Sequence, residues 1–143
     1  MKTTGEIVYG PDLSTKYLQS FFEVGVPAGF PSPAADYEES KLDLNRHLIK
    51  NPAATFFVRA SGDSMVGAGI HSGDLLIVDR SLEPRDKSVV IAIMDGELTV
   101  KRIRMGKRKI TLEPENENYS TWEISTDAEF EVWGVVTNVI HAL

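Results

Sequence analysis

The chain has 143 residues, of which 42% are hydrophobic and none is cysteine, and its net charge is −6. This length fits one domain with a real core, and the lack of cysteine excludes disulfides, zinc–thiolate sites and a thiol nucleophile. The acidic balance argues against a protein that coats nucleic acid through charge. No stretch reads as a signal peptide or a membrane span, so we expect a soluble cytoplasmic protein.

Residues 1–35 differ in composition from the rest of the chain. Prolines and glycines recur there at short intervals, and no long hydrophobic periodicity is present. Proline removes backbone donors and glycine adds conformational freedom, so we expect an extended arm rather than a folded unit. The following segment 43–50 predicts a short helix, because Asp43 is a good N-cap, Leu44 and Leu48 share a face, and Asn51-Pro52 ends the pattern.

Strand patterns dominate the remainder of the chain. Apolar runs, several rich in β-branched or aromatic residues, predict strands at residues 55–60, 74–79, 89–94, 97–103, 109–112, 121–124 and 130–136. Asp95-Gly96, between two of these runs, is a strong two-residue hairpin turn because both positions tolerate positive φ. Short strands joined by turns, with almost no helix, indicate a mainly β fold of largely antiparallel strands.

Two residues carry the candidate chemistry. Ser64 stands in a loop of small residues, 61–65, which can present a hydroxyl and aim backbone N–H groups at an oxyanion. Lys101 lies 37 residues later in a predicted strand. Burial there would lower the pKa of its amine, so that it could act as the base for a serine. Each residue also has an ordinary interpretation. Ser64 is then a polar turn residue, and Lys101 is a solvated lysine on an edge strand.

Several segments, taken in order, resemble the UmuD proteins of the LexA/UmuD family of self-cleaving serine peptidases. Residues 29–37 resemble the cleavage region, and residues 61–65 and 69–79 resemble the nucleophile loop with its following strand. Thr99-Val100-Lys101 resembles the segment that carries the general base, and residues 133–136 are similar to the family's terminal segment. The resemblance covers nearly the whole chain, and motifs in the right order make it specific. It implies the LexA/UmuD-type peptidase β-fold.

The resemblance also implies the catalytic residues. Ser64 would be the nucleophile and Lys101 the general base of a Ser–Lys dyad, with an oxyanion hole at the backbone N–H groups of Ser64 and Met65. The scissile bond would be Ala28–Gly29, so that residues 1–28 are an arm removed by self-cleavage and residues 29–143 are the peptidase domain. Cleavage within one chain and cleavage between two copies are both compatible with the sequence.

The same resemblance implies partners. In this family, RecA filaments on single-stranded DNA stimulate cleavage during the SOS response, and the processed form is an accessory subunit of an error-prone, UmuC-type translesion polymerase. We expect a homodimer, because exposed strand edges favour pairing. We expect no direct sequence-specific DNA binding and no membrane partner.

Three alternatives stay open from the sequence. The chain could be a catalytically idle binding module whose arm docks partners, a LexA-type repressor peptidase, or a protease that acts on other proteins. The short arm leaves no room for a helix-turn-helix domain, which disfavours a repressor. The absence of a membrane anchor disfavours a relative of the signal peptidases.

The histidines are given ordinary roles. His47, His71 and His141 show no metal-ligand spacing, so no metal and no cofactor is expected. His71 lies close to Ser64 in sequence and is a weaker candidate for the base, with Asp74 to orient it.

Three further features are also interpreted as ordinary. The basic run 101–109 is interpreted as a solvated hairpin. Trp122 and Trp133 are expected in the core or in a dimer interface. Residues 85–88 stand where members of the family often have a glycine turn.

Overall fold

The computed structural model describes residues 8–22, 26, 28–29, 39–125 and 127–143. The chain divides into two units, one formed by Met1–Pro11 with Asn51–Leu143 and the other by Asp12–Lys50. Within the described ranges, none of the helices has the length and hydrophobicity needed to span a membrane.

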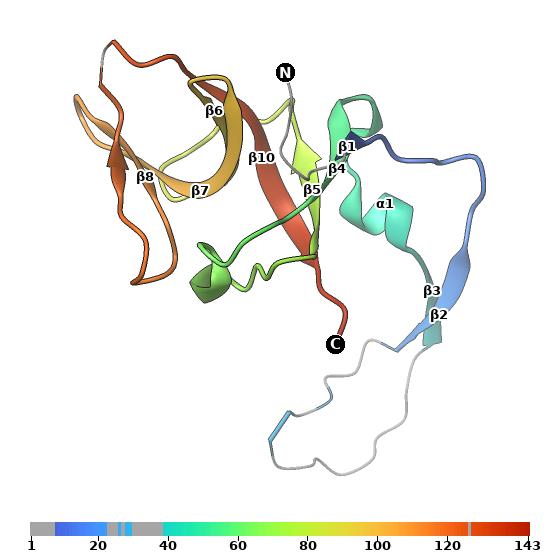
Figure 1. The fold of residues 1–143 in the computed structure, drawn as a ribbon. Helices are drawn as coiled ribbons and strands as arrows, with labels where there is room; N and C mark the ends of the chain where they lie inside the picture. Colours follow the sequence, from blue (N-terminus) through green and yellow to red (C-terminus); the bar gives the residue numbers. More distant parts are fainter. Residues whose placement is uncertain (1–7, 23–25, 27, 30–38, 126) are drawn as a thin grey trace. The chain divides into compact units, whose positions relative to one another are not determined.

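The first unit is built on one sheet of eight strands, in the order β1-β4-β5-β10-β6-β7-β8-β9, in which every pairing is antiparallel (Figure 1). The strands are β1 (Val8–Tyr9), β4 (Thr55–Arg59), β5 (Leu75–Asp79), β6 (Val89–Met94), β7 (Glu97–Met105), β8 (Ile110–Glu113), β9 (Trp122–Glu123) and β10 (Phe130–Ile140). Two short 3₁₀ helices, Pro52–Ala54 and Val66–Ala68, lie in the loops. The predicted mainly β, antiparallel fold is confirmed, and each strand predicted from residue 55 onward is present.

The β6–β7 hairpin has the turn that its sequence predicts. Asp95 and Gly96 have φ angles of 50° and 82°. Two consecutive residues with positive φ match the right-handed twist of the flanking strands. The resulting register pairs Lys101 of β7 with Val90 of β6, which is completely buried. The hairpin therefore carries Lys101 into the interior of the sheet.

β10 lies between β5 and β6 and joins the two halves of the sheet (Figure 1). Successive residues of a strand point to opposite faces, and β6 buries both of its faces. Val90 belongs to one hydrophobic cluster and Ile91, the next residue, belongs to another. The cluster that contains Ile91 also contains Met65 and Ile70, so the loop that follows β4 is anchored in the core.

Gly134 has no space for a side chain. An added Cβ would lie 2.5 Å from Cγ1 of Val78, which is completely buried and cannot move aside. We predict that Gly134→Ala lowers the free energy of unfolding by about 1–3 kcal/mol, the usual cost of overpacking. Urea unfolding measures this loss, with Gly10→Ala as the control because a Cβ there meets nothing within 4 Å. Equal unfolding midpoints for the two variants would show that the sheet adjusts freely at Gly134.

The second unit contains strands that the sequence did not predict. β2 (Leu18–Phe22) pairs with β3 (Glu39–Asp43), and in the first unit β1 pairs with β4. The extended arm therefore includes paired strands, which form with partners far along the chain and leave little local pattern. The predicted helix is confirmed as α1 (Leu44–Leu48), and the Asp43 side chain accepts a hydrogen bond from the Asn45 N–H at 3.0 Å.

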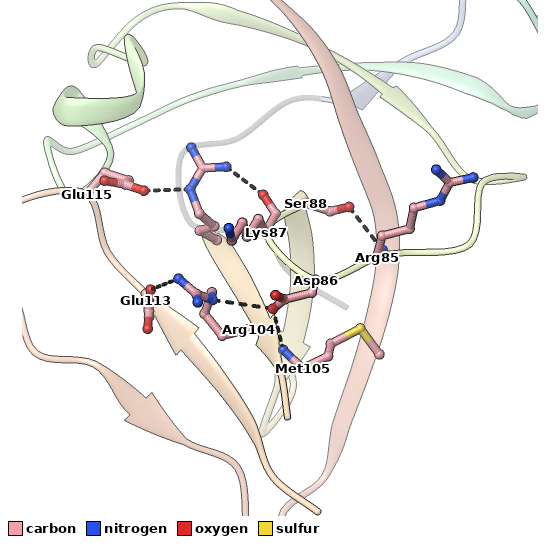
Figure 2. A network of polar contacts seen from close by, with 9 residues as sticks. Arg85, Asp86, Lys87, Ser88, Arg104, Met105, Glu113 and Glu115 are labelled. Atoms are coloured by element: carbon pink, nitrogen blue, oxygen red, sulfur yellow. Dashed lines mark hydrogen bonds and ion pairs between the residues drawn. The ribbon is translucent and has the colours of Figure 1, made fainter. Parts of the chain in front are cut away.

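The turn before β6 has a left-handed residue that is not glycine. Lys87 has a φ of 76°, a conformation that favours glycine. The turn is closed by a hydrogen bond from the Ser88 N–H to the Arg85 carbonyl at 3.0 Å, and the Ser88 hydroxyl accepts one from the Arg85 N–H. Figure 2 shows these residues beside β7 and β8. A lysine thus takes a left-handed turn position that glycine usually occupies.

The basic run 101–109 forms the β7–β8 hairpin, as interpreted from the sequence. Arg102 lies 2.5 Å from a carboxylate oxygen of Glu115. Arg104 pairs with Asp86 at 3.3 Å and with Glu113 at 3.7 Å (Figure 2). Because carboxylates of the same unit neutralise much of this charge, the run is not an unbroken cationic surface.

Candidate active site

The fold brings together the two residues that the sequence selects. Ser64 lies in the loop after β4, and Lys101 lies on β7. The lysine Nζ is 3.1 Å from the serine Oγ, which is hydrogen-bonding distance. Ser64 is half-buried, and the Met65 that follows it is buried in the core. The nucleophile loop, residues 60–65, is therefore held against the strand that carries the lysine.

The surroundings of Lys101 favour its neutral form. The residue is 6% exposed, and its Nζ also lies 2.9 Å from Oγ1 of Thr99 and 3.1 Å from the carbonyl oxygen of Val100. Burial lowers the pKa of the amine from its usual value of 10.5. No carboxylate of the described residues lies within ion-pair distance of Nζ. A neutral amine can donate to Thr99 and Val100 while its lone pair accepts the proton of Ser64.

A cleft of about 250 Å³ opens over this pair. One wall is the nucleophile loop, and the other is β7 at Leu98, Thr99 and Val100. Besides Ser64 and Lys101, the cleft is lined by small residues of the loop and by the larger apolar residues Met65, Ile70 and Leu98.

The two tryptophans have different environments. Trp122 is 41% exposed, and its ring centre lies 5.3 Å from the Lys101 Nζ, so it lies outside the core, and its alternative place in a dimer interface stays a prediction. Trp122 belongs to β9, an edge strand of two residues. Trp133 packs against the core, 5.5 Å from the ring of Phe56, as expected.

A second segment holds the nucleophile loop in place. The Glu115 N–H donates to the Ser64 carbonyl at 2.8 Å, and the Asn116 side chain donates to the Asp63 carbonyl at 2.8 Å. The Tyr119 hydroxyl donates to the Asp63 carboxylate, and this bond raises the pKa of the phenol. Sequence reasoning missed these supports, because residues more than 50 positions apart make them and no local motif marks them.

The expected oxyanion groups lie in the same loop. Gly62 has a φ of 84°, and this left-handed residue turns the chain just before Ser64. Among the described residues, no acceptor is found for the backbone N–H groups of Ser64 and Met65. Ser64 and Met65 both line the cleft, and the role of their N–H groups as an oxyanion hole stays a prediction.

The alternative base, His71, has different partners. Its Nδ1 lies 3.8 Å from Asp74, and its ring is 4.7 Å from the ring of His141. In the described part of the chain, Lys101 is the residue whose side-chain nitrogen is hydrogen-bonded to Ser64. The meeting of His71 and His141 at Asp74 was missed from the sequence, because 67 residues separate Asp74 from His141.

The expected scissile bond lies in the second unit. Ala28 and Gly29 are exposed, and a Cβ added to Gly29 would meet nothing within 4 Å. Pro27 and Phe30 on either side fall outside the described residues. The division of the chain into an arm of residues 1–28 and a peptidase domain of residues 29–143 therefore stays a prediction.

Comparison with known proteins shows the family of this chain. The family described as Peptidase S24-like matches residues 21–137, which include both Ser64 and Lys101. The chain belongs to the Peptidase S24-like family. It is similar to Protein SamA of Salmonella typhimurium, with 55% identity over 115 residues, which cover 80% of this chain and 79% of SamA.

Two further relatives extend this family relationship. Protein ImpA of Escherichia coli is 47% identical over 139 residues, which cover 92% of this chain and 89% of ImpA. Protein MucA of Escherichia coli is 44% identical over 119 residues, which cover 82% of this chain and 81% of MucA. This S24 chain is therefore a serine peptidase by family and a UmuD-like protein of SOS mutagenesis.

Proposed function

We propose that this UmuD-like S24 peptidase cleaves its own Ala28–Gly29 bond with a Ser64–Lys101 dyad. The observation that carries the proposal is the 3.1 Å contact between the serine Oγ and a buried lysine amine whose pKa is lowered. A serine needs a nearby base to attack a peptide bond, and a desolvated lysine supplies one near neutral pH.

The proposed reaction has two halves. The Ser64 oxygen attacks the Ala28 carbonyl carbon while Lys101 takes its proton, and the N–H groups of Ser64 and Met65 stabilise the oxyanion. Lys101 then returns the proton to the Gly29 nitrogen, and the C–N bond breaks to leave Ala28 as an ester on Ser64. A water, deprotonated by the same amine, hydrolyses this ester and frees the Ala28 carboxylate.

The consequence of the cut would be an exchange of partners. Removal of residues 1–28 leaves 115 of the 143 residues, since 143 − 28 = 115, and retains β4 to β10.

Family membership supports a role in SOS mutagenesis, in which RecA filaments on single-stranded DNA stimulate the cut and the product assists a UmuC-type translesion polymerase. The cut also removes β1 and leaves β4 as an edge strand, and an unpaired edge of this kind favours pairing with a second copy of the chain in a homodimer.

The test is the intact mass of the purified full-length chain after incubation at alkaline pH. We predict a product that lacks residues 1–28, because the lysine is neutral there and can act. We also predict that Gly29→Glu blocks this product, since a long charged side chain next to the scissile carbonyl does not fit a cleft of about 250 Å³. Gly10→Glu is the matched control, because a Cβ meets nothing within 4 Å at either glycine.

Two outcomes would contradict the proposal. The same product from Gly29→Glu as from the wild type would place the scissile bond elsewhere. A chain that stays intact at alkaline pH, and also with RecA on single-stranded DNA, would favour the idle binding module.

A further inference from the structure

A second cluster of functional side chains lies outside the serine–lysine site. His71 and Asp74 come from the loop before β5, and His141 directly follows β10. One ligand atom from each of these three residues lies within 4.8 Å of the others. The His141 Nδ1 is 2.5 Å from one carboxylate oxygen of Asp74, and the His71 Nδ1 is 3.8 Å from the other. The two histidines therefore converge on one carboxylate.

The carboxylate at the centre of the cluster is fixed in position. Asp74 is 4% exposed, and one of its oxygens accepts a hydrogen bond from the His71 N–H at 2.7 Å. Its own backbone holds the loop closed, because its N–H donates to the His71 carbonyl and its carbonyl accepts from the Ala60 N–H. A ligand that is already ordered loses little conformational entropy when it binds an ion.

The histidines, in contrast, can be reached from solvent. The side chain of His71 is 50% exposed and that of His141 is 43% exposed. Donors around one tetrahedral zinc ion are about 3.3 Å apart, given zinc–ligand bonds near 2.0 Å. The two nitrogen–oxygen distances of the cluster, 2.5 Å and 3.8 Å, lie on either side of that value, so binding of one ion requires the exposed rings to rotate.

We propose that His71, Asp74 and His141 form a binding site for a divalent transition-metal ion, with Zn²⁺ as the best match. Two imidazoles and a carboxylate are ligands that zinc, nickel and copper prefer, whereas Mg²⁺ and Ca²⁺ prefer oxygen donors. Three protein ligands leave the fourth zinc position to water. The site contains neither Ser64 nor Lys101, so the proposal of a metal site does not rest on the proposed self-cleavage.

The ion would connect two parts of the fold that are far apart in sequence. It would tie the loop of residues 70–74 to the end of β10. The same loop supports the nucleophile loop, because the Ser72 hydroxyl accepts a hydrogen bond from the Gly62 N–H at 3.2 Å and the Gly73 N–H donates to the Ala60 carbonyl at 2.8 Å. Bound zinc would therefore stabilise the framework behind Ser64 without touching the cleft.

The test is calorimetric titration of ZnCl₂ into the full-length chain, produced without a histidine tag and freed of metal with a chelator. We expect one zinc per chain, no binding of MgCl₂, and a rise in melting temperature of about 5–10 °C at 100-fold excess over Kd. His71→Ala and His141→Ala should each weaken zinc binding by at least about tenfold. Loss of a residue that only hydrogen-bonds to a metal ligand already lowers metal affinity by that factor, and these two residues are ligands themselves.

The chain supplies its own matched control. His47 is its one remaining histidine and lies exposed on α1, so His47→Ala removes an imidazole and leaves the cluster intact. This variant should bind zinc as the wild type does. Equal zinc affinity in all three histidine variants would overturn the proposal, and so would one zinc per two chains or no binding of zinc at all.

Discussion

We expect Ser64→Ala to abolish the proposed self-cleavage of the full chain and to leave its fold intact. The substitution removes the only oxygen that the proposed dyad can use for attack, so we predict a fall in cleavage rate of about 10⁴-fold or more. The fold survives because the Lys101 amine keeps its contacts with Thr99 and Val100. The measurement is the fraction of intact chain against time at alkaline pH, read by mass spectrometry.

Ser61 provides the matched control for this experiment. It lies in the same loop and lines the same cleft, and it is exposed. Ser61→Ala should therefore cleave at close to the wild-type rate. If Ser64→Ala releases the same product as fast as Ser61→Ala does, Ser64 is not the nucleophile and a different residue or a contaminating protease makes the cut.

Local sequence patterns predicted the larger sheet well. The strands from residue 55 onward show apolar runs bounded by turn residues, and Asp95-Gly96 defines the hairpin without reference to the rest of the chain. β2 and β3 were missed because the pairing partners are separated by a long connection. A strand whose stability comes from a distant neighbour carries little signal of its own.

The same distinction applies to the site. Residues in recognisable segments could be predicted, whereas contacts between distant parts of the chain could not. Ser64 and Lys101 were selected from their segments and from the family resemblance, and the fold places them 3.1 Å apart. The supports of the loop at Glu115 and Tyr119 were not foreseen, because a glutamate or a tyrosine in a loop has no distinctive pattern. The contact between His71 and His141 was not predicted either. Metal-ligand motifs are recognised in a sequence by short spacing, and these two histidines are far apart along the chain.

Lys101→Ala removes the proposed base, and with it the dependence of cleavage on pH. In the wild type only the neutral amine can take the serine proton, so the cleavage rate rises about tenfold per pH unit below the lysine pKa and levels off above it. Because burial lowers this pKa, the midpoint lies below the usual value of 10.5. We predict that Lys101→Ala cleaves at least about 10³-fold more slowly at the wild-type plateau.

The pH profile separates a lysine base from a histidine base, which a single-point rate does not. Cleavage is followed by intact mass from pH 6 to 10, roughly the range between a strongly shifted and an ordinary lysine. Lys107→Ala is the control, because it removes an exposed lysine of the β7–β8 hairpin and should keep the wild-type profile. A midpoint near 6.5, the ordinary pKa of histidine, that persists in Lys101→Ala would contradict the dyad and make His71 the base.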